Sequence, residues 1–515
     1  MKLKTTAILA VCGVLVSAAG AFAIPVARPV AGPDPSATNA IGVAAGEGWQ
    51  SGARITAGDT LLVDARLGHA SLPKAAAGET YLFAQVTASE DKAAPSAVTP
   101  MNLAIVVDRS GSMKGERIAN AMNAAVFAVE RMRDGDSVTV VSFDTAAQVV
   151  VPPTRISAGN RSSIESAIRS IRLGGDTCIS CGLVEGMQQL ALTSLTGDRI
   201  SRMILLSDGA TNAGVRDMAG LRGMANRMHG RGVTISTIGV DVDFDEKVMA
   251  AIASEANGRH YFVANSSGLP AVFGQEFDDL LASVAKETEL AISLAPGVEV
   301  AEVFDRSFRR EGNKLIVPFG TFSAKQEKTV LVKLRVPTDR DGDQPVADVK
   351  LAFRDLVKRA DGACSGSLSV AVKADGSEQQ ELDPFVAARL ERSRTAQTLT
   401  EANKLFEAGR VGEARAKLAA RKTDLKKTET TALAFAAAAP SAAPRRSARG
   451  LDRDFADQAA AVDEAEQHFA PAPVAARPAS AGPTGGFAAP PPAQASRDGK
   501  AQVRANQEKA SSFGF

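Results

Sequence analysis

Oxygen-bearing side chains follow an apolar segment in the sequence LAIVVDRSGSM, which runs from Leu103 to Met113. Asp108, Ser110 and Ser112 stand on alternate residues at its end. The apolar run predicts a buried parallel strand, and the polar residues would then lie in the loop at the strand's carboxyl end, where open α/β sheets bind ligands. One carboxylate and two hydroxyls suit a hard cation, magnesium or manganese rather than zinc. We therefore treat this segment as a candidate metal site.

Two later segments offer further oxygen ligands. Thr177 follows the glycine pair 174–175, and Asp208 ends an apolar run that begins at Ile204. Because the carboxyl-end loops of parallel strands meet at one edge of a sheet, we expect both side chains to approach Asp108. The simpler explanation is that the serines and the threonine only cap helices, as these residues often do. The three segments together favour the metal site.

The elements that would position these residues alternate between strand and helix over residues 101–287. The predicted strands are 103–107, 137–143, 202–207, 233–240 and 260–264, with 147–151 as an antiparallel edge partner. The predicted helices are 115–133, 161–171, 182–195, 215–230, 246–256 and 269–287. This alternation predicts an α/β domain with a doubly wound, mostly parallel sheet.

Taken together, these motifs resemble the metal-ion-dependent adhesion site (MIDAS) of von Willebrand factor type A (VWA) domains. The whole chain is similar to bacterial secreted proteins that set such a domain between β-strands. The resemblance implies that Ser110 and Ser112 coordinate the ion directly, and that Asp108, Thr177 and Asp208 bind it directly or through water. It implies Mg²⁺ or Mn²⁺, with Ca²⁺ ranked behind them. It further implies a protein partner whose carboxylate completes the coordination shell.

Cysteines mark the one place where the site departs from the family pattern. Asp176 precedes Thr177, and Cys178 and Cys181 follow it. A C-x-x-C in an oxidising compartment predicts a local disulfide, which would fix the threonine, while Asp176 would add negative charge. A zinc site lacks a second cysteine pair and nearby histidines. A thioredoxin-like role needs an activated thiolate at the start of a helix, and the neighbouring sequence supplies no activating group. Cys364 is left free or intermolecular.

The N-terminal residues have the pattern of a secretory signal peptide over 1–23. Two lysines precede the apolar stretch 7–16, and an A-x-A sequence predicts cleavage after Ala23. A lipoprotein is the less favoured alternative, since Cys12 ends only a weak lipobox. No other stretch is apolar for the roughly 20 residues that cross a bilayer. We therefore expect a secreted, periplasmic or cell-surface protein with no transmembrane segment in the mature chain.

The remaining residues predict additions to the α/β domain. We expect a flexible leader over 24–47 and an antiparallel β-sandwich over 288–375, which the strands of 48–100 join. A helical hairpin is predicted over 376–430, followed by a disordered Ala/Pro-rich tail over 431–515, which a charged helical patch near 454–468 interrupts. The expected fold class is thus a doubly wound sheet combined with a β-sandwich and a short C-terminal helical region.

Composition narrows the function. A net charge of +1 and an aromatic content of 5% argue against nucleic-acid binding. The sequence has neither H-E-x-x-H nor G-x-S-x-G, so we expect a binding protein and not an enzyme. A metal-assisted hydrolase, which would need a general base near the ion, and a structural scaffold of a cell-envelope complex are the alternatives. An acidic helix N-terminus explains the three aspartates Asp241, Asp243 and Asp245 better than a calcium site does.

Overall fold

The structure is a computed structural model that describes most of the chain. The described residues are 52–75, 78–89, 99–193, 199–242, 244–374, 381–438, 445–469 and 496–514. The predicted signal peptide, its cleavage after Ala23, Cys12 and the leader over 24–47 lie outside these residues.

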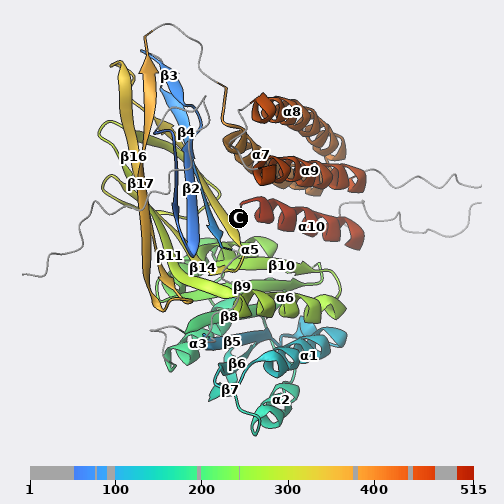
Figure 1. The fold of residues 1–515 in the computed structure, drawn as a ribbon. Helices are drawn as coiled ribbons and strands as arrows, with labels where there is room; N and C mark the ends of the chain where they lie inside the picture. The colour runs from blue at the N-terminus through green and yellow to red at the C-terminus, as the bar shows by residue number, and fades with distance from the viewer. Residues whose placement is uncertain are drawn as a thin grey trace, which may run out of the picture. The chain divides into compact units, whose positions relative to one another are not determined.

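A six-stranded sheet with the order β10-β9-β8-β5-β6-β7 forms the centre of the α/β domain (Figure 1). β5 lies between β6 and β8 and runs parallel to both, while β7 at the edge is antiparallel to β6. This arrangement confirms the doubly wound, mostly parallel sheet. The strands are β5 (Met101–Asp108), β6 (Ser137–Phe143), β7 (Ala147–Arg155), β8 (Ile200–Ser207), β9 (Val233–Val240) and β10 (Asn257–Val263).

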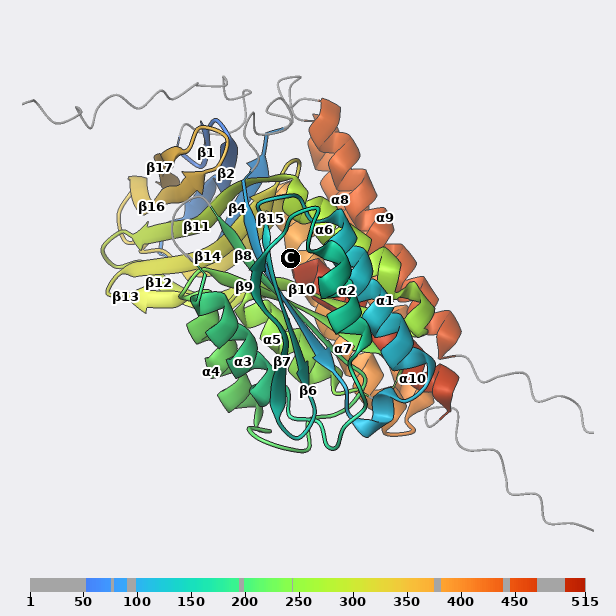
Figure 2. The same ribbon diagram turned by 90° about the horizontal axis from the view of Figure 1, so that it is seen from below.

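Helices cover both faces of this sheet, as Figure 2 shows. On one face are α1 (Glu116–Arg131), α2 (Arg161–Arg169) and α6 (Leu269–Leu281), and on the other are α3 (Ile179–Ala191), α4 (Met218–His229) and α5 (Glu246–Glu255). The residues of strand β5 from Leu103 to Val107 are all apolar because both faces of the strand are buried. Its successive side chains point to opposite faces, so Ile105 and Val107 enter one core while Ala104 and Val106 enter the other.

One predicted helix is shorter than expected. The prediction of a helix over 269–287 is wrong in its last part, because α6 ends at Leu281 and strand β11 (Ser283–Leu294) begins there. Val284 and Ala285 are buried in the core of the β-sandwich. Strand pairing with β14 and β16 therefore takes over a segment whose apolar residues also fit a helix.

The β-sandwich consists of two further sheets, with the orders β1-β2-β4-β15-β12 and β13-β14-β11-β16-β17-β3. β4 pairs with β15, and β3 pairs with β17, which confirms that strands before residue 100 complete the sandwich. The early strands are β1 (Arg54–Gly58), β2 (Leu61–Leu67), β3 (Ser71–Pro73) and β4 (Glu79–Ala88). The later strands are β12 (Glu299–Phe304), β13 (Arg309–Glu311), β14 (Lys314–Ser323), β15 (Glu327–Arg335), β16 (Gly342–Asp355) and β17 (Ala360–Lys373).

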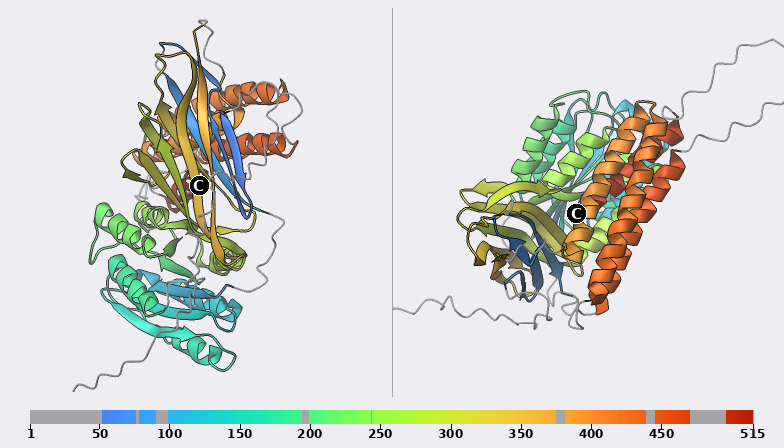
Figure 3. Two further views of the ribbon diagram at one scale, coloured as in Figure 1. Left: turned by 60° about the vertical axis from the view of Figure 1, so that its left-hand side comes forward. Right: turned by 90° about the horizontal axis from the view of Figure 1, so that it is seen from above.

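The C-terminal region contains more helix than the sequence led us to expect. It comprises α7 (Pro384–Glu407), α8 (Val411–Ala438), α9 (Arg445–His468) and α10 (Arg497–Gly514), whose orange and red ribbons lie alongside one another in Figure 3. The disordered tail predicted over 431–515 is therefore wrong for 431–438, 445–468 and 497–514. Alanine favours helix, and sparse apolar residues such as Phe455, Val462 and Phe513 are buried between the helices. Among the described helices, none combines the length and apolar character needed to cross a membrane.

Candidate metal centre

Asp108 is fixed at the carboxyl end of β5 by two hydrogen bonds. Ser207 at the end of the neighbouring strand β8 donates its hydroxyl to Asp108 Oδ2 at 2.5 Å, and the Ser110 backbone N–H donates to Asp108 Oδ1 at 2.8 Å. Burial raises the pKa of the Asp108 carboxyl to about 6, with a smaller contribution from the charge of Asp208 and with these hydrogen bonds opposing the rise. The side chain is fully buried and cannot turn away from the loop.

The predicted ligand residues come together at this edge of the sheet. Ser110 Oγ and Ser112 Oγ are 3.0 Å apart, and Ser112 Oγ donates to Asp208 Oδ1 at 2.6 Å. Thr177 joins them across Gly209, because a methyl group added at this glycine would lie 3.3 Å from both Ser112 Oγ and Thr177 Oγ1. A larger residue at this position would require one of the two hydroxyls to shift by a few tenths of an ångström.

Backbone hydrogen bonds hold the threonine loop against the other two. Gly111 N–H donates to the Gly175 carbonyl at 3.0 Å, and Thr177 N–H donates to Asn212 Oδ1 at 2.7 Å. The Thr177 carbonyl accepts in turn from Asn212 N–H at 3.0 Å. Hydrogen bonds therefore join three loops that are distant in sequence into one site.

Arg117 is a part of this site that the sequence reasoning missed. Its guanidinium donates to Asp208 Oδ2 at 2.7 Å and to the Ser112 carbonyl at 2.9 Å, and it also pairs with Asp241. Asp241 follows β9, the neighbour of β8, so the strand-end rule that selected Asp208 could have selected it too. Asp245 is an acidic residue at a helix N-terminus, as the alternative to a calcium site predicted, because its side chain caps α5 by accepting from Val248 N–H. Asp243 lies outside the described residues.

The geometry of these oxygens fits a small hard cation. Magnesium binds oxygen near 2.0–2.1 Å in an octahedron, in which adjacent ligands are about 3 Å apart. The hydroxyls of Ser110 and Ser112 already have that spacing. Among the described residues, no three His, Cys, Asp or Glu side chains form a metal-binding group. This candidate instead combines two carboxylates with three hydroxyls, a set of oxygens that suits magnesium or manganese.

The C-x-x-C pair forms the disulfide that the sequence predicted. The sulfur atoms of Cys178 and Cys181 are 1.97 Å apart, at the start of α3 and directly after Thr177. Cys364 is a free thiol on β17, and burial raises its pKa to about 11.

Three of the histidines have structural partners away from these loops. His69 contacts Thr80, His260 contacts Thr237, and His229 contacts Asn257, each through a ring nitrogen. Within the described part of the chain, no hydrogen bond joins a histidine to Asp108, Ser110, Ser112, Thr177 or Asp208. No described histidine is therefore placed by a hydrogen bond to serve as the general base that the hydrolase alternative needs.

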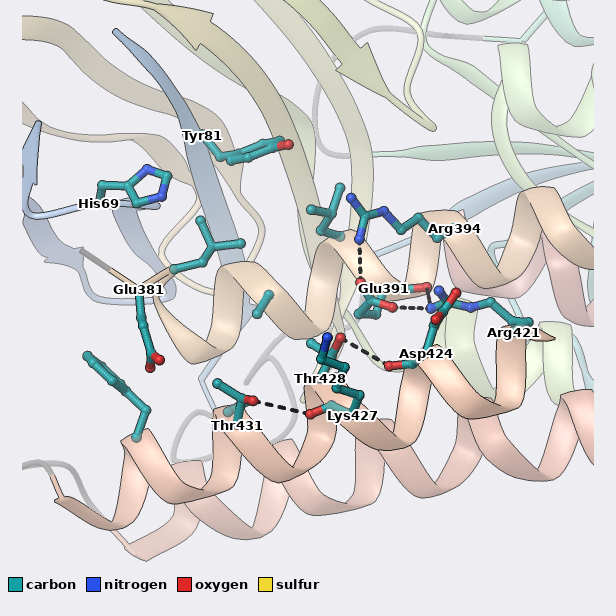
Figure 4. Close-up of a pocket in the computed structure, with 15 residues that line it drawn as sticks. His69, Tyr81, Glu381, Glu391, Arg394, Arg421, Asp424, Lys427, Thr428 and Thr431 are labelled. Atoms are coloured by element: carbon teal, nitrogen blue, oxygen red, sulfur yellow. Dashed lines mark hydrogen bonds and ion pairs between the residues drawn. The ribbon is translucent and has the colours of Figure 1, made fainter. Parts of the chain in front are cut away.

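A cavity of about 650 Å³ lies elsewhere, between the β-sandwich residues His69 and Tyr81 and the helices α7 and α8 (Figure 4). Part of its charged wall is paired, because Glu391 accepts from Arg394 at 2.7 Å and also contacts Arg421. The cavity contains none of the predicted ligand residues.

Comparison with known families agrees with this geometry. The model of the von Willebrand factor type A domain matches residues 102–275, which contain all six strands of the central sheet except the first residue of β5. Residues 102–275 form a VWA domain. VWA domains often mediate protein–protein interaction or adhesion, and they commonly bind a divalent metal at a MIDAS.

Relatives and solved structures extend the similarity beyond the VWA domain. The chain is 26% identical to the uncharacterized protein sll0103 of Synechocystis over 294 residues, 55% of this chain and 69% of that protein. It is 29% identical to YfbK of Escherichia coli over 38% of this chain and 34% of that protein. A von Willebrand factor type A structure from Catenulispora acidiphila has a TM-score of 0.60 and covers 72% of this chain and 88% of that one, at 17% identity. The ArnB paralog VWA2 from Sulfolobus acidocaldarius has a TM-score of 0.55 and covers 89% of this chain and all of that one, at 15% identity. At these identities the two structures establish the fold alone.

Proposed function

We propose that this protein is a secreted or periplasmic binding protein whose VWA domain recognises a carboxylate of a protein partner through a bound Mg²⁺ or Mn²⁺. Asp108, Ser110, Ser112, Thr177 and Asp208 would hold the ion. The observation that carries the proposal is the convergence of three hydroxyls and only two carboxylates at one edge of the sheet, where Ser112 is exposed and the other four residues are buried. When bound, the ion supplies a Lewis-acidic position for an oxygen of the partner.

Charge balance is compatible with an anionic partner. Asp108 and Asp208 together match a dication, but Arg117 already neutralises part of the charge on Asp208. Because Asp241 shares Arg117, the site with its ion would be close to neutral, so a carboxylate from outside would meet no excess negative charge and could complete the coordination shell.

The fixed loops also favour binding of the partner. Because the two serine hydroxyls and the backbone of Thr177 are held by hydrogen bonds before any partner arrives, binding does not have to order them, and less affinity is lost to conformational entropy.

The location outside the cytoplasm is supported by the Cys178–Cys181 disulfide, since disulfides persist mainly in oxidising compartments. We favour a binding role over a metal-assisted hydrolase because His69, His229 and His260 contact other parts of the fold. A scaffold role in a cell-envelope complex predicts retention of partners without metal, so the two can be separated by chelation.

An array of short peptides tests the proposal directly. Peptides that contain Asp or Glu, each beside its matched Asn or Gln version, are probed with the full chain in MgCl₂ and in EDTA. We expect binding that needs both the carboxylate and the metal, and that Ser112→Ala abolishes. Equal binding of the acid and amide peptides, or binding that survives EDTA, would refute carboxylate recognition through the metal.

A further inference from the structure

We propose that the Cys178–Cys181 disulfide is a reversible redox modification site that controls the metal affinity of the VWA domain. The co-reactant would be a dithiol, of the kind that a small protein dithiol or dithiothreitol presents. The inference rests on the proposed function, because the property that it controls is binding of the metal next to Thr177.

The two cysteines differ in access. Cys178 is fully buried, whereas Cys181 one turn into α3 is partly exposed. An incoming thiolate therefore reaches the sulfur of Cys181, and the sulfur of Cys178 becomes the leaving group.

The structure supplies the activation that the sequence alone did not reveal. Cys178 is the N-cap of the 13-residue helix α3, and its Sγ accepts a hydrogen bond from Cys181 N–H at 3.3 Å. Ser180 Oγ lies 3.5 Å from the same sulfur. Helix N-termini and N–H donors stabilise a thiolate, so the leaving group is a good one.

The exchange balances in two steps. A thiolate of the reductant attacks Cys181 Sγ, the S–S bond breaks, and its electron pair passes to Cys178 Sγ, which takes up a proton. The second thiol of the reductant then attacks the mixed disulfide and releases Cys181 as a thiol. The protein gains two electrons and two protons, and the dithiol is oxidised to a disulfide.

Contacts around Cys178 connect this chemistry to the metal loops. Its N–H donates to the Asp144 carbonyl at 2.8 Å, and it directly follows Thr177. Its sulfur also fills the space beside Gly214, in the loop after Asp208, where an added methyl group would clash with it. Close-packed interiors have little free space for change.

Reduction removes the covalent link between the Thr177 loop and the first turn of α3. Two sulfurs that are no longer bonded have to separate to nonbonded contact, and the buried one has Gly214 and Ser180 against it. The displacement passes to Thr177, whose carbonyl is tied to Asn212 and Ala213 of the same loop. We expect the threonine hydroxyl to lose its position, and the reduced protein to bind metal more weakly.

The test measures Mn²⁺ affinity of the full chain by isothermal titration calorimetry in both redox states. The reduced sample is prepared with dithiothreitol and moved to thiol-free anaerobic buffer, so that the dithiol does not chelate the ion. Mass spectrometry after alkylation reports the state of each cysteine and separates Cys364 from the pair. Cys178→Ser/Cys181→Ser provides a form that cannot switch, and Cys364→Ser is the matched control that keeps the pair.

We expect reduction to weaken Mn²⁺ binding about tenfold and reoxidation to restore it. Alkylation should reach Cys181 before Cys178, and the double serine variant should bind like the reduced protein in both buffers. Equal affinities in the two states, or a disulfide that excess dithiothreitol leaves intact in the folded protein, would overturn the inference. If neither state binds Mn²⁺, the proposed function itself fails, which is a different outcome from equal binding.

Discussion

At the scale of single residues, Arg117 is the side chain that most changes our view of the site. It touches Asp208, the Ser112 carbonyl and Asp241, and so connects two predicted ligand residues with a third strand end. A basic side chain beside a cation site repels the ion but also fixes the carboxylate that binds it. Because Asp208 Oδ1 must face the ion while Oδ2 is held away, we expect the second effect to win.

Replacing Arg117 by alanine should therefore weaken Mn²⁺ binding, by about tenfold, or roughly 1.4 kcal/mol. Calorimetric titration measures the change. Arg131→Ala is the matched control, since Arg131 lies on the same helix and pairs with the exposed Asp278. Unchanged or tighter binding in Arg117→Ala would show that the arginine does not position Asp208.

Gly209 offers a second test at this scale. A methyl group there would lie 3.3 Å from the hydroxyls of both Ser112 and Thr177, which is closer than methyl groups usually approach. Gly209→Ala should therefore turn one hydroxyl away and weaken Mn²⁺ binding, with little change in the thermal midpoint of the metal-free protein. Gly159→Ala has open space around the added methyl and serves as the control. Equal Mn²⁺ affinities of the two variants would place the hydroxyls outside the metal shell.

At the scale of elements, the strand ends and the helical hairpin of α7 and α8 were predictable, whereas α9 and α10 were not. In an alternating α/β pattern, the run of apolar residues before Asp108 predicts a buried strand. The strand, the loop after it and the position of Asp208 beside it could therefore be predicted from the sequence. Arg117 was not predictable in the same way, because its contacts depend on how α1 leans over the sheet. The sequence did not predict α9 and α10 because their apolar residues are few, and these residues become buried only in the clusters that they form with α7 and α8.

Helix α10 also contacts the VWA domain, through Arg504. This arginine donates to Glu246 Oε2 at 2.7 Å and to the Phe244 carbonyl at 3.3 Å. Burial raises the pKa of Glu246 to about 7, although the charge of Arg504 acts in the opposite direction. The folded protein therefore keeps a proton that the unfolded chain has already released.

Stability should consequently fall as the pH rises from about 4.5 to about 7 and then stop changing through this group. Glu246→Gln removes the titration, so its thermal midpoint relative to wild type should rise across that window. The free energy involved is at most about 3 kcal/mol. Glu299→Gln on the exposed start of β12 is the control. A midpoint difference between Glu246→Gln and wild type that stays constant from pH 5 to pH 8 would contradict the raised pKa.

At the scale of the whole molecule, the VWA domain is one part of a larger fold. The S. acidocaldarius structure matches 89% of this chain, so the similarity includes more than residues 102–275. The β-sandwich was predictable in outline because apolar and polar residues alternate along its strands, and because the strands before residue 100 needed partners. The change from helix to strand at residue 283 was not predictable, because Val284 and Ala285 fit the apolar pattern of a helix as well as that of a strand. Only their neighbours β14 and β16 favour the strand.

The central claim is that the full chain binds a divalent ion through the five oxygen-bearing side chains. The most direct measurement is the thermal midpoint of the oxidised protein in EDTA and in increasing MnCl₂ or MgCl₂, for wild type and for Asp108→Ala. Since an ion that binds only the folded state stabilises it, we expect the wild-type midpoint to rise with metal and the Asp108→Ala midpoint to stay where EDTA leaves it. A wild-type midpoint that does not respond to either ion, or an equal rise in both proteins, would contradict the assignment.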